Sequence, residues 1–275
     1  MGVIVLGVCL ASGSRNALSA PQSVQEKGGI CVRQVGRSPA VPGVSIWIDE
    51  PARGAVLPAG QDVMLKIRLT GFEPGKQTDT PRAREIANSA MGQHVHVIVD
   101  NEPYLAFYDV SQPIALKNLK PGPHAVRVFP SRSYHESVKE PGAFQLRNFW
   151  VGEHTRPLIS TRSPFITYSR PKGDYVGREA ERLLVDFYLS NAQLGPDKYK
   201  ARLTVDGNQF LLTEWTPYYV EGLSPGTHTF QMELLDPAGK VVPGMANSTT
   251  REINLKPATV PTASGLSQDR CCNTP

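Results

Sequence analysis

The sequence predicts an all-β fold of two tandem immunoglobulin-like or fibronectin-III-like β-sandwiches with flexible termini. The first observation is a repeat: the stretches 96–104 and 119–124 recur in similar form as 202–210 and 223–228. A spacing of about one hundred residues matches a sandwich domain and exceeds the period of solenoid repeats. The second observation is composition, because 24 glycines and 24 prolines in 275 residues suit short strands joined by many turns.

Alternating apolar residues mark the strands of each unit. In the first unit the apolar positions are Val63, Leu65, Ile67 and Leu69, and in the second unit they are Leu183, Val185, Phe187 and Leu189. Such alternation indicates strands with one face toward a core and the other toward water. We therefore expect the intervening residues to be solvated: Lys66, Arg68, Thr70, Asp186, Tyr188 and Ser190.

The next strand of each unit follows the same pattern and ends in turn residues. Val95 and Val97 are expected to point inward, and Asp100-Asn101 and Asp206-Gly207 supply hairpin turns. One short loop helix is expected over 82–90. The remaining predicted strands cover 44–49, 104–108, 112–119, 124–130 and 143–151, then 157–168, 201–205, 209–215, 217–223, 228–235 and 249–255.

The predicted organisation along the chain has five parts. An apolar run over 3–11 and the small residues that end at Ala20 predict a signal peptide over 1–20, and hence a periplasmic, secreted or cell-surface protein. Lipidation of Cys9 is a minority alternative. The other parts are a flexible linker over 21–43, sandwiches over 44–152 and 153–256, and a disordered tail over 257–275.

The charge of the chain indicates which classes of partner are disfavoured, and its cysteines raise a separate question of pairing. With 29 basic against 25 acidic residues and no basic block, nucleic acid is disfavoured as a partner, and no transmembrane span is expected. Cys31, Cys271 and Cys272 lie outside the repeats. Either Cys31 pairs with one of the C-terminal cysteines, or all three have no set role.

Several motifs resemble a family of uncharacterised bacterial exported proteins with two tandem sandwich domains. The resemblance covers about residues 44–256 and implies an extracytoplasmic protein of unknown role and no catalytic residue. Members are sometimes labelled phosphopeptide-binding, but this chain contains no motif that supports such binding. The motifs are Gln93-His-Val-His-Val97, Ser131-Arg-Ser-Tyr-His-Glu-Ser137, 168–177 and 184–189.

Three histidines form the candidate metal site. His94 and His96 are two residues apart on one strand and therefore share the face opposite Val95 and Val97. The long loop that carries His135 is expected at the same end of the sandwich. Imidazoles at this spacing favour zinc or copper, with Glu136 as a possible fourth ligand.

Two other interpretations of this region remain open. The same histidines with Arg132, Tyr134, His135, Glu136 and Lys139 could bind an anion, a glycan or a protein. Alternatively the region is a solvated rim, since Lys200 and Arg202 occupy the histidine positions in the second unit. The basic turn over 169–173 is another anion-site candidate, although a solvated loop is favoured there.

His124 and His228 are expected to be structural. Each follows a Pro-Gly-X turn at the start of the equivalent strand, where its ring can hold the preceding corner. The sequence as a whole favours an exported, non-enzymatic binding or surface-interaction protein of unknown ligand, with no cofactor. The alternative is a metal-binding protein or metal-dependent enzyme that uses zinc or copper at His94, His96 and His135.

Overall fold

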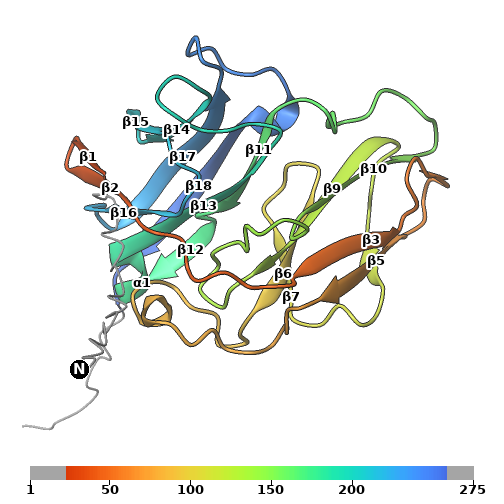
Figure 1. Cartoon of the computed structure of the whole chain (residues 1–275), viewed down its shortest axis with the longest axis horizontal. Helices are drawn as coiled ribbons and strands as arrows, with labels where there is room; N and C mark the ends of the chain where they lie inside the picture. The colour runs from red at the N-terminus through yellow and green to blue at the C-terminus, as the bar shows by residue number, and fades with distance from the viewer. Residues whose placement is uncertain (1–22, 259–275) are drawn as a thin grey trace, which may run out of the picture.

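The computed structural model describes residues 23–258 of the chain (Figure 1). The predictions for the signal peptide, for Cys9 and for the Cys271 and Cys272 pair lie outside the described residues. No helix in the described part is long and apolar enough to span a bilayer. The helical segments are short: η1 (Pro81–Arg84), α1 (Arg178–Glu181) and η2 (Met245–Asn247).

The first sandwich consists of a five-stranded and a three-stranded sheet. The larger sheet runs in the order β4 (Val56–Leu57), β10 (Gln145–Val151), β9 (Gly122–Ser131), β6 (His94–Val99) and β7 (Leu105–Phe107). The smaller sheet runs in the order β3 (Ser45–Glu50), β5 (Val63–Thr70) and β8 (Ile114–Leu116).

The second sandwich repeats this arrangement and extends it. One sheet runs in the order β12 (Gly173–Val176), β18 (Ser248–Lys256), β17 (Gly226–Leu235), β14 (Lys200–Val205) and β15 (Asn208–Leu212). The other runs in the order β1 (Val24–Lys27), β2 (Ile30–Gln34), β16 (Tyr218–Glu221), β13 (Arg182–Ser190) and β11 (Phe165–Arg170).

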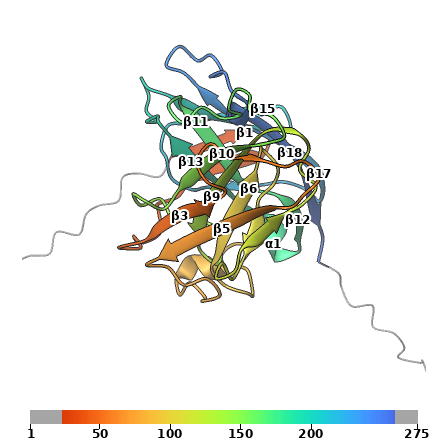
Figure 2. The same cartoon turned by 90° about the vertical axis from the view of Figure 1, so that its right-hand side faces the viewer.

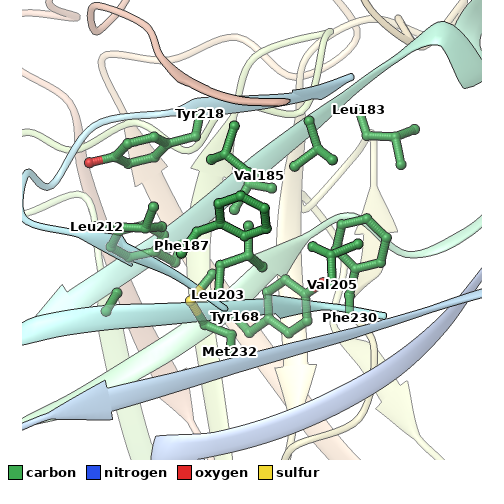
Figure 3. Packing of buried hydrophobic residues seen from close by; sticks show 14 of the residues in the cluster. Tyr168, Leu183, Val185, Phe187, Leu203, Val205, Leu212, Tyr218, Phe230 and Met232 are labelled. Atoms are coloured by element: carbon green, nitrogen blue, oxygen red, sulfur yellow. The ribbon is translucent and has the colours of Figure 1, made fainter. Parts of the chain in front are cut away.

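The predicted fold of tandem sandwiches is confirmed. Strand β4 pairs in parallel with β10, and its counterpart β12 pairs in parallel with β18; β3 and β11 each carry a register shift near their ends. Alternate residues fill each core as expected. In the second unit Phe187, Phe230 and Tyr168 pack between the two sheets (Figure 3). The predicted helix over 82–90 is present only as the 3₁₀ turn η1.

The expectation of a flexible linker over 21–43 is wrong for residues 24–34. These residues form the hairpin β1–β2, which lies beside β16 at the edge of the second sandwich (Figure 1). Ile30 and Val32 alternate with polar residues and point into the core of that sandwich. Since β16 would otherwise leave its backbone groups unpaired, a short alternating segment that precedes the first sandwich can close this edge.

The expectation that the outer faces of the sheets are solvated is wrong where the two sandwiches meet. They lie side by side in Figure 1, and Figure 2, viewed from the right-hand side of Figure 1, shows the first sandwich in front of the second. The outer face of β6 and β9 packs against that of β11 and β13, and contacts such as Arg127 Nη1 to Thr167 Oγ1 at 3.1 Å join them. Asp186 and Tyr188 are consequently 0% and 7% exposed. Residues that the alternation assigned to water belong to a buried interface between the sandwiches.

Candidate functional site

His94 and His96 lie on the outer face of β6, opposite the core residues Val95 and Val97, and both are 0% exposed. The second sandwich covers them, which is why they are buried although they point away from their own core. The Nδ1 of His94 lies 2.9 Å from the Gly92 carbonyl oxygen, and the Nδ1 of His96 lies 3.1 Å from Ser169 Oγ. Both contacts leave the Nε2 atoms facing each other at 3.0 Å.

His135 joins these two rings from the loop after β9. A tight turn, in which the His135 N–H donates to the Arg132 carbonyl, returns the chain toward β6. His135 has a positive φ of 69°, a backbone region in which histidine is enriched among non-glycine residues. Its Nδ1 lies 3.1 Å from His94 Nε2. Ligand atoms of His94, His96 and His135 therefore all lie within 4.8 Å of one another.

The three rings are held neutral. Burial lowers the pKa of His94 to about 4, against an opposing hydrogen bond to Gly92, and Arg170 lowers it further. Burial also lowers the pKa of His96 and His135 well below the usual value, aided by the other histidines and Arg170. Neutral imidazole has one N–H and one lone pair, so each ring can present a lone pair to a metal ion.

The lone pair of His94 has two neighbours. The Gly92 carbonyl can only accept, so His94 carries its proton on Nδ1 and presents a lone pair at Nε2. That single lone pair faces both His96 Nε2 and His135 Nδ1 at hydrogen-bond distance. It can accept one good hydrogen bond, whereas a cation among the three nitrogens would satisfy all three lone pairs.

Aromatic rings and two cations surround the cluster. The Tyr104 ring stacks on His96 with ring centroids 3.5 Å apart, and the ring centroids of Tyr108 and His94 lie 4.9 Å apart. On the Tyr104 ring, Lys172 Nζ lies 4.0 Å from the centroid and Arg170 Cζ lies 5.4 Å from it. Phe129 also contacts the cluster, with its ring centroid 5.2 Å from that of His96.

The other predicted ligand-binding residues contact protein groups. Arg132 donates to the Pro39 carbonyl, and the hydroxyls of Tyr134 and Ser38 lie 2.7 Å apart. Glu136 pairs with Arg82, and Lys139 Nζ lies 2.5 Å from Asp186 Oδ1. The structure therefore brings together the three histidines, while Arg132, Tyr134, Glu136 and Lys139 contact protein groups outside this cluster.

The site also includes residues that sequence reasoning did not assign to it. Ser169, Arg170 and Lys172 come from the basic turn of the second unit, and Tyr104 immediately precedes β7 in the first unit. The basic turn was visible as a motif, but its place beside β6 depends on how the two sandwiches pack. No local signal in the sequence indicates that packing.

His124 and His228 make the same contacts in the two units. The Nδ1 of His124 lies 2.9 Å from Asp100 Oδ2, and its Nε2 lies 2.7 Å from the Lys120 carbonyl oxygen. The Nδ1 of His228 lies 2.6 Å from Asp206 Oδ2, and its Nε2 lies 2.7 Å from the Ser224 carbonyl oxygen. Each ring thereby ties the hairpin after one strand to the corner before another, away from the three-histidine cluster.

His228 should make stability depend on pH. Burial disfavours its charged ring, but the hydrogen bonds to Asp206 and Ser224 favour it more, so the pKa of His228 is raised. The resulting stabilisation is complete below the unfolded pKa of about 6.5 and is lost as pH rises through the folded value. We expect His228→Gln to destabilise the protein more at about pH 5.5 than at about pH 8.5 in urea unfolding. An equal loss at both pH values would contradict this role.

Comparisons with known proteins give no family for the chain. No family model matches it, and no curated protein matches it. Among solved structures, it is similar to fibronectin(III)-like modules of Clostridium thermocellum CbhA, with 15% identity, TM-score 0.27, and 78% of this chain and 95% of that chain covered. It is also similar to the extracellular domain of a putative hybrid two-component system from B. thetaiotaomicron, with 10% identity, TM-score 0.28, and 86% and 44% covered.

A third similar structure is a Bacteroides ovatus protein from a mixed-linkage glucan utilization locus, solved with a mixed-linkage heptasaccharide. It has 11% identity and TM-score 0.23, with 77% of this chain and 47% of that chain covered. At such identities and TM-scores, these similarities carry no argument about what this chain binds.

Proposed function

We propose that this chain is a non-enzymatic binding protein whose ligand is a transition-metal ion, copper or zinc, held by His94, His96 and His135. The observation that supports it is the convergence of three neutral imidazoles with nitrogen separations of 3.0 and 3.1 Å. Ligand nitrogens at about 2.0–2.1 Å from a tetrahedral ion lie about 3.4 Å apart. Since the three ligand nitrogens all lie within 4.8 Å of one another, small movements of the rings would admit one ion. Export to the periplasm or outside the cell is part of this proposal and rests on residues 1–20.

The groups behind the ligands also suit a metal. Metal-binding histidines commonly donate their other ring N–H to a carbonyl or another acceptor, which fixes the tautomer and the ring orientation. Here the Gly92 carbonyl oxygen accepts from the Nδ1 of His94, and the Ser169 hydroxyl lies at hydrogen-bond distance from the Nδ1 of His96. Ser169 belongs to the second sandwich, so both units contribute to the orientation of the ligands.

Conservative substitutions of the ligands test the proposal. Glutamine places a polar atom near the Nε2 of His94 or His96, and asparagine places one near the Nδ1 of His135 and tolerates its positive φ. We expect the full chain to retain about one copper or zinc ion per molecule after loading and desalting. His94→Gln, His96→Gln and His135→Asn should each retain less than about a tenth of that.

His154→Gln is the matched control, because His154 is exposed and its ring packs against Trp150 outside the cluster. Elemental analysis gives the metal content, and thermal unfolding shows whether each variant is folded. Wild-type protein that holds neither ion, or folded ligand variants that retain as much as the wild type, would contradict the metal site.

A further inference from the structure

The candidate metal site contains no group that would offset the charge of a bound ion. In the described part of the chain, the cluster consists of three histidines, without carboxylate or thiolate. Neutral imidazole ligands leave the full ionic charge in place. A divalent ion at this site would therefore keep both of its positive charges in a buried environment, where charge is costly.

Two further positive charges lie close to the cluster. Arg170 and Lys172 both contact the ring of Tyr104, which in turn stacks directly on His96. Arg170 is 8% exposed, and its Nη1 donates to the Tyr175 hydroxyl. Within residues 23–258, neither cation forms an ion pair with a carboxylate. Both charges therefore repel an ion held by the histidines, in proportion to its charge.

The surroundings also disfavour a fourth ligand. The rings of Tyr104, Tyr108 and Phe129 pack on His94 and His96. Zinc in proteins is almost always four-coordinate and completes three histidines with water or hydroxide. The faces of these rings attract a cation without supplying a ligand atom. The Tyr104 hydroxyl lies 3.3 Å from His135 Nδ1, to which it can donate a hydrogen bond.

We propose that the site selects Cu⁺ over Zn²⁺, a proposal that rests on the metal-binding function proposed above. A monovalent ion experiences half the repulsion from Arg170 and Lys172 and loses less solvation energy on burial. It also needs no fourth ligand from the packed aromatic side. The three-histidine cluster is thus a reduced-copper site whose specificity comes from charge.

Competition titrations on the full chain test this selectivity. Cu⁺ would be titrated without oxygen against a coloured Cu⁺ chelator, and Zn²⁺ against a coloured Zn²⁺ chelator. We expect the Kd for Cu⁺ to be lower than that for Zn²⁺ by about 100-fold or more. If Zn²⁺ binds as tightly as Cu⁺, the proposed selectivity is contradicted, but metal binding by this chain is supported. If neither ion binds, the proposed function itself fails.

Lys172 offers a test of the charge mechanism. Lys172→Met removes one positive charge, and the free energy gained is proportional to the charge of the ion. The factor by which Zn²⁺ binding tightens should therefore be about the square of the factor for Cu⁺, for example about 25-fold against about fivefold. Lys172→Arg keeps the charge and should leave both values near wild type. Equal tightening of both ions by Lys172→Met would overturn the mechanism.

Discussion

Asp186→Asn is expected to lower the free energy of unfolding by about 3–5 kcal/mol, although asparagine has nearly the same shape. Asp186 is 0% exposed and lies 2.5 Å from Lys139 Nζ across the interface between the sandwiches. The side chain of Lys139 is 3% exposed, so it cannot turn to water when its partner is neutralised. The variant would bury an ammonium group without the carboxylate that it directly contacts, a large cost that urea unfolding would measure.

A paired replacement separates this explanation from lost packing. Lys139→Met with Asp186→Leu removes both charges and keeps apolar volume, so most of the stability should return, to within about 2 kcal/mol of wild type. A single Asp186→Asn variant that loses less than about 1 kcal/mol would mean that water reaches the pair and that the sandwiches are not tightly joined.

Phe129→Ala is expected to cost about 3–5 kcal/mol, the usual loss when a buried phenylalanine is truncated. Phe129 is 0% exposed and packs edge-on against His96, with ring centroids 5.2 Å apart. Its ring also approaches Phe144 and Tyr188, so it joins the first sandwich to the second. Because the cavity frees one side of His96, metal affinity should fall by about tenfold in the same variant.

Two controls accompany this substitution. Phe129→Leu fills much of the space and should cost only about 1 kcal/mol. Leu105 lies on β7 of the same sheet and is 52% exposed, so Leu105→Ala should change stability by less than about 0.5 kcal/mol. Phe129→Ala with unchanged stability, measured by thermal and urea unfolding, would show that the interface is not packed as described.

Much of the fold was predictable because its signals are local. Alternation along a strand decides which residues face a core, and turn residues such as Asp100 and Asp206 mark where strands reverse. The repeat showed that one sandwich follows another, and it placed His124 and His228 in equivalent corners. The spacing of His94 and His96 likewise required them to share a face of one strand.

Other features depend on contacts between distant segments. The alternation in 24–34 is short, and only the open edge beside β16 makes it a hairpin. Asp186 was expected in water, and His94 and His96 on an outward face, because alternation shows which face points away from a core but not what covers that face. The packing of β6 and β9 against β11 and β13 decides this.

The sequence by itself determined two repeated sandwiches, their strand faces and the three histidines that could share a metal ion. Only the tertiary structure decided that His135 reaches His94, that the second sandwich buries the cluster, and that Arg170 and Lys172 lie beside it. The physical reason is that periodicity describes one chain segment at a time. Burial and electrostatic potential depend on which two surfaces meet, and these surfaces come from separate domains.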